Sequence, residues 1–433
     1  MIVIPSLVVT AVSFLIKQQN DGVKNLIYSS LFLILTAINL SVVIYMGWRW
    51  KALIAVSILI LIVSWFFGKH YKKLVVVLSM MTLFALVKFT YYYFGTIATN
   101  DNWVQPTEIT NITFTNNPNI YLIQPDGYAS KTALENSHYN YDNDTFYDQL
   151  TQKGFLFNHT YRSNYGSTLT SNATLFTAQH HFYNNGIMDN ELPDARELIM
   201  GENPVLTTLK NNGYRTTAVL QHRYLLLNHP EVFYDRINIK PSDLSVLPNY
   251  HYDADYVNDL KTFMNTASNQ PQFYFIEILE PSHITGKENP DSNAIQERTN
   301  YIHKLEGTNT QLLSIINHIE QEDPKAIIII ASDHGGYVGY NFTEESMKGT
   351  TNEIALKQGV FGSLYAISYP KQDSSKPLPK SSINLFPHLF SLLSNDSIPK
   401  KDNSSYQIIK SGKQKGVYKY YDNDGNATME QTH

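Results

Sequence analysis

Four apolar stretches fill the first 93 residues and constrain what this part of the chain can fold into. They run over residues 2–16, 26–48, 52–67 and 74–93. The second has full membrane-spanning length, while the first and third need flanking residues or a thin bilayer to span. Aromatic residues lie at the stretch ends, as interfacial anchors do: Trp48, Trp50, Trp65 and Tyr91 to Tyr93. We predict a multi-pass membrane anchor of about four helices over residues 1–95.

Positive charges in the loops predict the orientation of this anchor. The first and third loops together carry five lysines, Lys17, Lys24, Lys69, Lys72 and Lys73. The middle loop has only Arg49 and Lys51. Loops rich in Lys and Arg stay in the cytoplasm, so both termini and everything after residue 95 are expected outside it. A single cleaved signal peptide does not fit, because further apolar stretches follow the first.

Composition narrows the classes of partner and site. The net charge of −5 and the pI near 6.3 give no global basic field, so no nucleic-acid partner is expected. Cysteine is absent, which excludes disulfides, thiolate metal sites and a cysteine nucleophile. The polar, Asn- and Thr-rich segment 96–118 reads as a linker, and residues 119–433 as one large extracytoplasmic domain.

Short β-rich runs alternate with helical patterns in this domain. The runs cover residues 119–123, 216–220, 273–279, 326–331 and 363–368, and residues 305–319 have helical spacing. This alternation predicts an α/β fold, with a mostly parallel sheet and helices on both faces. A later run, 417–421, leads into the turn 422–425 and is expected to be a peripheral strand. No glycine-rich phosphate loop occurs, which argues against a nucleotide enzyme.

The run 326–331 ends in Ser332-Asp333-His334-Gly335-Gly336. A run this apolar reads as a central parallel strand, and ligands gather at the carboxyl ends of such strands. The Asp oxygen and His nitrogen can both hold a divalent cation, while the two glycines allow close backbone approach. Asp126 ends the first run in the same way. Each Asp is equally consistent with the capping of a turn, so a metal site needs further ligands.

Hydroxyl groups crowd the front of segment 164–177, and a helix is expected to follow them. A hydroxyl at a helix start faces backbone N–H groups and the positive end of the helix dipole, which stabilise an alkoxide and an incoming phosphate. The alternative is a plain N-cap in a Ser/Thr-rich loop.

Taken in order, these segments resemble the alkaline phosphatase superfamily, in particular its sulfatase-like branch of membrane-anchored phosphoethanolamine and phosphoglycerol transferases. The resemblance spans about residues 119–393 and is carried by segments 119–127, 168–177, 213–218, 280–283, 332–335 and 382–387. It implies that Asp126, Thr168, Asp333 and His334 hold one divalent metal ion, with Thr168 also the nucleophile. Oxygen ligands with one imidazole suit Mn²⁺, Mg²⁺ or Zn²⁺.

The resemblance also gives roles to histidines. His283 is implied to contact the phosphate or to protonate a departing oxygen, the alternative being a structural loop histidine. His222 is a weaker candidate for the same substrate pocket. His180, His181 and His251 are expected at the surface.

Two departures from the family pattern matter. Sulfatases need a Cys or Ser followed by Pro and Arg, and this chain has Thr168, Thr170 and Asn172 at those positions, which argues against sulfate ester hydrolysis by that route. No His occurs in 335–351 to complete a second zinc site, which favours a single metal.

The resemblance therefore implies a metal-dependent transferase in the cell membrane. It would move a phosphoethanolamine or phosphoglycerol group from a membrane phospholipid to a cell-envelope glycan through a phospho-threonine intermediate. Two alternatives stay open: a hydrolase of the same fold, and a non-catalytic membrane module.

Overall fold

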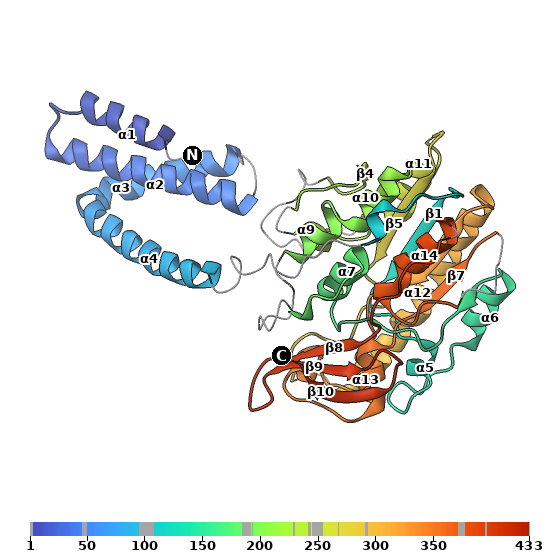
Figure 1. The fold of residues 1–433 in the computed structure, drawn as a ribbon. Coiled ribbons are helices and arrows are strands. Elements are labelled where there is room, and N and C mark those ends of the chain that lie inside the picture. Colours follow the sequence, from blue (N-terminus) through green and yellow to red (C-terminus); the bar gives the residue numbers. More distant parts are fainter. Residues whose placement is uncertain are drawn as a thin grey trace. The chain divides into compact units, whose positions relative to one another are not determined.

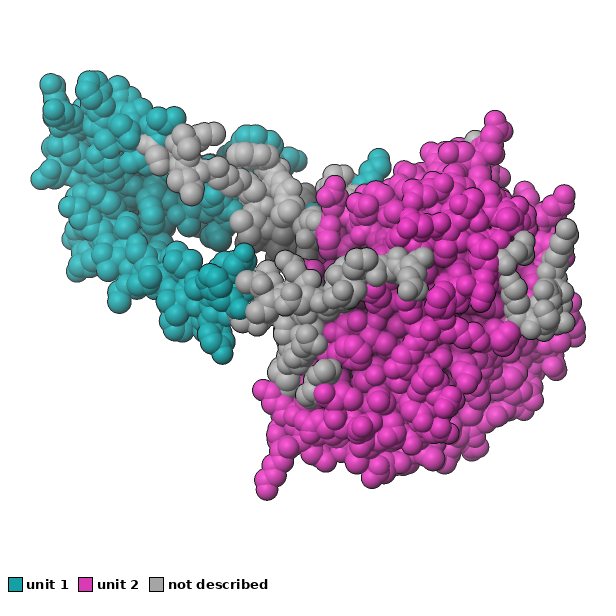
Figure 2. Space-filling view, in the orientation of Figure 1, with its two compact units in different colours: residues 1–99, 240–251 teal, residues 100–239, 252–433 magenta. Residues whose placement is uncertain are grey.

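The computed structural model describes residues 3–45, 50–94, 108–183, 194–227, 230–240, 254–266, 268–290, 293–370, 377–394 and 396–432, with Leu192 and Leu244. The chain forms two compact units (Figure 2). Unit 1 comprises residues 1–99 and 240–251, and unit 2 comprises residues 100–239 and 252–433. The segment limits 1–95, 96–118 and 119–433 stay a prediction.

Where the structure describes them, the four apolar stretches of unit 1 are helical. Its helices are α1 (Val3–Leu15), α2 (Asp21–Tyr45), α3 (Trp50–Phe67) and α4 (Tyr71–Tyr92). Among the described residues, two stretches are long and apolar enough to cross a membrane, Asp21–Leu40 and Trp50–Tyr91. The short 3₁₀ turn η1 (Gly68–His70) divides the second stretch into α3 and α4. Large apolar side chains on both helices are exposed, for example Phe66 and Leu83, as in lipid-facing helices.

The two lysine-rich loops lie at the same end of unit 1. The start of α2 contacts η1, where a Cβ on Gly68 would lie 3.1 Å from Ser29 Oγ. The Tyr28 and Tyr71 rings stack at 6.2 Å between centroids. This arrangement is the one that the predicted orientation requires, and the number of spans stays a prediction.

Unit 2 is built on a seven-stranded sheet in the order β2-β7-β6-β1-β5-β3-β4 (Figure 1). The strands are β1 (Ile120–Pro125), β2 (Leu156–Phe157), β3 (Arg215–Leu220), β4 (Arg236–Ile237), β5 (Gln272–Ile278), β6 (Ile327–Ala331) and β7 (Tyr365–Ser368). Strands β6, β1, β5, β3 and β4 run parallel, whereas β7 pairs antiparallel with β6 and with β2. The predicted α/β class and mostly parallel sheet are confirmed, and run 363–368 forms the antiparallel strand β7.

Helices cover both faces of this sheet. On one face, Phe275 of β5 packs on Phe176 of α7 (Thr168–Thr177), and Phe273 packs on Phe386 of α14 (Leu385–Ser394). The intervening Tyr274 and other β residues face the main core, with α12 (Ala294–Glu322) and α6 (Asp144–Gln152). Because successive side chains of a strand point to opposite faces of the sheet, alternate residues of β5 contact different helical layers.

Shorter elements complete unit 2. Helices are α5 (Lys131–Leu134), α9 (Ala195–Met200), α10 (Pro204–Asn211), α11 (Tyr256–Met264) and α13 (Ile354–Phe361). The 3₁₀ turns are η4 (Glu108–Asn111), η5 (Tyr224–Leu226), η7 (Thr343–Met347) and η8 (Ser382–Asn384). A second, antiparallel sheet joins β8 (Ser405–Ile409), β9 (Gly416–Tyr421) and β10 (Ala427–Gln431). The strand expected at 417–421 is thus β9. The buried Arg162 guanidinium lies 5.0 Å from the Tyr421 ring, which ties this sheet to the domain.

The described end of the predicted linker packs on unit 2. Phe114 is 7% exposed, its N–H donates to Asn212 Oδ1 at 2.7 Å, and its ring lies 5.2 Å from that of Phe390. The Thr115 N–H donates to the Leu393 carbonyl at 2.9 Å. The rest of the linker, up to residue 107, lies outside the described residues.

Gly336 provides a test of the close packing between β6 and α12. A Cβ at Gly336 would lie 2.2 Å from Tyr301 Cε2, so Gly336→Ala is expected to cost about 1–3 kcal/mol of unfolding free energy by overpacking. Gly307→Ala, in α12 with nothing within 4 Å, should instead gain up to about 1 kcal/mol. Thermal unfolding of the purified protein measures both, and equal midpoints would contradict this account of the packing.

Candidate active site

Neighbouring strand ends and one helix start bring the candidate residues together. Asp126 directly follows β1, and Asp333 and His334 follow β6. Since β1 and β6 pair in parallel, their carboxyl ends lie at the same edge of the sheet. Thr168 is the first residue of α7, as the hydroxyl-rich segment predicted. The backbone N–H groups of the first turn of α7 therefore lie next to its hydroxyl.

Asp126, Thr168, Asp333 and His334 form a compact cluster, called here the four-residue cluster. Thr168 Oγ1 lies 3.2 Å from both Asp126 Oδ1 and His334 Nε2. His334 Nε2 lies 3.3 Å from Asp126 Oδ1 and 3.4 Å from Asp333 Oδ2. One ligand atom from each of the two aspartates and the histidine lies within 4.8 Å of the others. All four residues are buried, with Thr168 and Asp126 the more accessible at 9% and 7%.

The donor atoms of the cluster suit a divalent cation. His334 Nδ1–H donates to the Gly335 carbonyl at 2.8 Å, so the neutral ring presents the Nε2 lone pair to the cluster. Asp333 Oδ1 accepts from the Gly127 and His334 N–H groups, whereas Asp333 Oδ2 is buried without a hydrogen-bond partner. A buried oxygen without a partner is costly, and a metal ion would satisfy it. Three oxygens and one nitrogen are donor atoms that Mn²⁺, Mg²⁺ or Zn²⁺ can accept, and the assignment of these four residues as ligands stays a prediction.

The pKa shifts of the cluster residues also favour a bound cation. The pKa of Asp333 is raised to about 6, chiefly by burial; the nearby His334 lowers it and the nearby Asp126 contributes to the rise. Burial lowers the pKa of His334, but Asp333 and Asp126 outweigh this and leave it raised. The groups thus crowd negative charge into a volume with little water, which a bound cation would neutralise.

Hydroxyls and amides hold the cluster in place. Ser171 of α7 donates its hydroxyl to the Asp333 carbonyl at 2.6 Å. Ser332 Oγ donates to the His334 carbonyl at 2.8 Å and accepts from the Tyr128 N–H at 2.9 Å. Gln124 of β1 and Asn172 of α7 exchange two amide hydrogen bonds, at 2.8 and 2.9 Å. The start of α7 is therefore fixed against β1 and β6, and Thr168 with it.

His283 lies beside the cluster. Its ring centroid is 5.8 Å from that of His334 and 6.2 Å from that of Tyr337. His283 Nδ1–H donates to the Ile284 carbonyl at 2.6 Å, which leaves Nε2 as an acceptor. Burial and the nearby His334 lower the pKa of His283 to about 4, so the ring is neutral at pH 7. This state suits proton acceptance better than proton donation.

The other histidines discussed in the sequence analysis lie in different environments. His222 is half-buried two residues past β3, at the same sheet edge as the cluster, and its substrate role stays a prediction. The surface expectation for His181 is wrong: it is fully buried, stacks on Tyr165 at 3.9 Å, and its Nε2–H donates to the Thr170 carbonyl. His180 is half-buried, and its Nε2–H donates to the Asp402 carbonyl at 2.8 Å. His251 lies outside the described residues.

Sequence analysis missed Glu277. This residue of β5 pairs with Gln124, is 1% exposed, and neither carboxyl oxygen has a hydrogen-bond partner. Burial raises the pKa of Glu277 well above its usual range, and the nearby Asp126 and Asp333 raise it further, so its surroundings disfavour the charged form. The signal was a single acidic residue inside the apolar run 273–279.

A mostly parallel α/β sheet whose carboxyl edge carries a hydroxyl, two carboxylates and an imidazole defines an enzyme of the alkaline phosphatase superfamily, in its sulfatase-like branch. The chain belongs to the Sulfatase family, whose model matches residues 118–395, more than half of the 433 residues. The predicted family is thereby confirmed.

Several solved structures are similar to this chain. The C-terminal periplasmic domain of EcEptC from Escherichia coli is 12% identical, with 72% of this chain and 95% of that chain covered and a TM-score of 0.48. Lipooligosaccharide phosphoethanolamine transferase A (EptA) from Neisseria meningitidis is 11% identical, with 80% and 71% covered and a TM-score of 0.45. Lipoteichoic acid synthase LtaP from Listeria monocytogenes is 12% identical, with 74% and 91% covered and a TM-score of 0.43. No curated protein gives a significant match.

Metal binding should weaken as the pH falls through about 6, because protons then compete with the cation for Asp333, and for His334, whose pKa is also raised. Equilibrium dialysis against Mn²⁺ or Zn²⁺, followed by elemental analysis across a pH series, measures this. Asp333→Asn should lose the metal at every pH, and Asp148→Asn on α6 should not. Metal content that is independent of pH, or unchanged in Asp333→Asn, would contradict the proposed ligand set.

Proposed function

We propose that the protein is a metal-dependent transferase that moves a phosphoethanolamine or phosphoglycerol group from a membrane phospholipid to a cell-envelope glycan. The observation that carries the proposal is the Thr168 hydroxyl, which starts α7 and lies 3.2 Å from both Asp126 and His334. A hydroxyl in that position is suited to attack phosphorus and to form a covalent intermediate.

In the first half-reaction, Thr168 attacks the phosphorus of the lipid headgroup. A bond forms between Thr168 Oγ1 and phosphorus, and the bond from phosphorus to the diacylglycerol oxygen breaks. Thr168 loses its proton and the departing oxygen gains one. The hydrogen bond from Thr168 to Asp126 gives that proton a place to move. A Mn²⁺, Mg²⁺ or Zn²⁺ ion held by the four-residue cluster would lower the pKa of the hydroxyl and neutralise a phosphate oxygen.

In the second half-reaction, a glycan hydroxyl replaces Thr168 on phosphorus. The hydroxyl must lose a proton while Thr168 Oγ1 regains one. Neutral His283, with Nε2 available, is the residue that we assign to accept the proton from the incoming hydroxyl. His222, at the same sheet edge, is assigned to substrate binding.

The anchor supports a lipid donor. We propose that unit 1 crosses the cell membrane several times and leaves unit 2 on the outer side. The lysine-rich loops at one end of unit 1 support this orientation. A headgroup donor can then reach the enzyme from the bilayer. A hydrolase would use the same first half-reaction and differ only in passing the group to water.

Thr168→Ala should abolish transfer, with a loss of about 10³-fold or more in turnover. Purified wild-type protein mixed with phosphatidylethanolamine or phosphatidylglycerol vesicles should yield a headgroup phosphate adduct on the peptide that contains Thr168, seen by mass spectrometry. The Ala variant should lack the adduct, whereas Thr177→Ala, at the other end of α7, should keep it.

Normal turnover by Thr168→Ala would refute the covalent mechanism. If wild-type protein formed the adduct but released only free headgroup phosphate in the presence of an envelope glycan, the protein would be a hydrolase. Absence of the adduct and of turnover in metal-loaded wild type would point to a non-catalytic module.

His283→Gln should lower turnover by about 10²-fold or more while leaving metal content unchanged, since it removes a proton acceptor without removing a ligand. The pH profile of kcat/KM should also change its acid limb. His303→Gln, an exposed histidine on α12, is the matched control. Full activity of His283→Gln, or loss of its metal, would contradict this role.

A further inference from the structure

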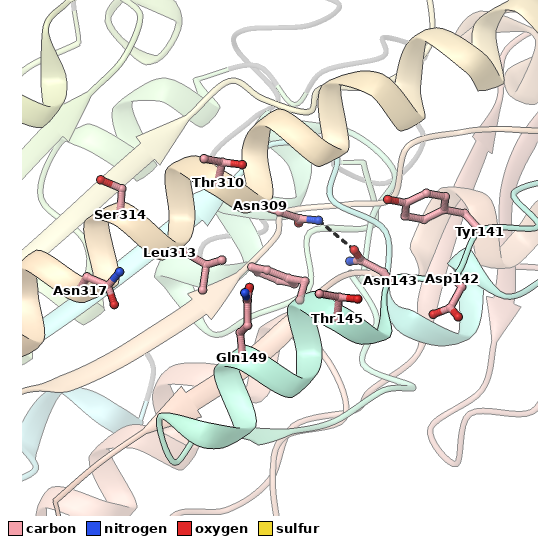
Figure 3. Close-up of a pocket in the computed structure, with 11 residues that line it drawn as sticks. Tyr141, Asp142, Asn143, Thr145, Gln149, Asn309, Thr310, Leu313, Ser314 and Asn317 are labelled. Carbon is pink, nitrogen blue, oxygen red and sulfur yellow. Dashed lines mark hydrogen bonds between the residues drawn. The ribbon is translucent and has the colours of Figure 1, made fainter.

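A groove with a volume of 570 Å³ lies between α6 and α12 (Figure 3). It is on the opposite helical face of the sheet from α7, and none of its lining residues belongs to the four-residue cluster. Apart from Asp142, Phe146 and Leu313, every described side chain that lines it ends in an amide or a hydroxyl. The described lining contains no Lys, Arg or His.

Side-chain contacts join the two helices at both ends of this groove. At one end, Asn309 Nδ2 of α12 donates to Asn143 Oδ1 at 2.8 Å, drawn as the dashed line in Figure 3. Asn143 also donates to the hydroxyl of the fully buried Tyr128, which in turn donates to Asn309 Oδ1. At the other end, Lys153 Nζ pairs with Glu320 Oε2 at 2.7 Å. The groove between these contacts is therefore preformed.

The apolar stripe of α12 packs in the core with Phe146 and Leu150 of α6, but the neighbouring stripe that lines the groove is mostly polar. Residues 309, 313, 317 and 320 lie along one stripe of α12, where apolar residues would pack against a neighbouring helix. Here Ser314 and Asn317 stay exposed on α12, and Gln149 stays exposed on α6. Phe146 and Leu313 are the apolar residues of the described lining.

This lining matches one ligand chemistry. Amides and hydroxyls both donate and accept hydrogen bonds, as the hydroxyl groups of a sugar do. A phosphate-rich or sulfate-rich polymer would need cationic side chains, which the described lining lacks. A lipid chain would need a mostly apolar wall.

We propose that the groove between α6 and α12 binds a neutral segment of a glycan chain, at a site separate from the four-residue cluster. The groove adds a contact for the glycan partner named in the proposed function. Glycan binding in the groove requires no catalysis, so the binding proposal and the proposed transferase function can fail separately.

The test uses full-length protein in a detergent without a sugar headgroup, because such a headgroup would compete. Short malto-, cello- and manno-oligosaccharides are the probes, with binding followed by saturation-transfer NMR and titration calorimetry. At least one probe should bind wild type. The double variant Gln149→Ala/Asn317→Ala should bind about tenfold more weakly, through loss of two hydrogen-bonding groups. Ser314→Trp should fill the groove and abolish binding.

Thr299→Val is the matched control. Thr299 is exposed on the same helix, outside the groove, and its hydroxyl donates to its own helix as that of Thr310 does. Thr299→Val and Thr168→Ala should both bind like wild type, and circular dichroism melts establish that each variant is folded. The proposal is wrong if no neutral oligosaccharide binds wild type, if folded Ser314→Trp still binds, or if only poly(glycerol phosphate) or peptide binds.

Discussion

Two carboxylates and one imidazole are buried within about hydrogen-bond reach of each other, and much of the structure of unit 2 is needed to hold them there. The pairing of β1 with β6 brings Asp126 close to Asp333 and His334, and the hydrogen bond from Ser171 brings the start of α7 to them. Gly336 has no room for a side chain because Tyr301 lies against it. The sheet order, the position of α7 and the close packing at Gly336 together fix the positions of the charged side chains.

Much of this centre could be predicted because its signals are local. A strand that ends in an Asp, and a hydroxyl that starts a helix, are visible in a few consecutive residues, which is why Asp126, Asp333 and Thr168 were found. The family resemblance, carried by segments in a fixed sequence order, groups these residues into one predicted site. The helices and most strands of the domain follow from the same short-range patterns.

Other features depend on contacts between distant residues. The antiparallel direction of β7 follows from how the chain returns to β6, which run 363–368 does not encode. His181 is buried because Tyr165, 16 residues earlier, stacks on it, and the Tyr165 hydroxyl oxygen accepts a hydrogen bond from the His181 N–H. In the sequence, Glu277 is one polar residue in an apolar run. Only the pairing of β5 with β1 places it opposite Gln124, two residues before Asp126. The groove between α6 and α12 likewise requires contacts between distant residues, such as Asn143 and Asn309, which are 166 positions apart.

Helix α12 connects several of these features along a single axis. Its 29 residues extend over about 43 Å at 1.5 Å per residue. Near its start, Tyr301 donates to the Gly127 carbonyl, next to Asp126, and further along, Asn309 and Glu320 contact α6. Each residue inserted into α12 would rotate everything beyond it by about 100°. Even an insertion of a whole turn, which restores the rotation, would move the contacts beyond it by about 5.4 Å along the helix axis, so the length of α12 is constrained by its contacts near both ends.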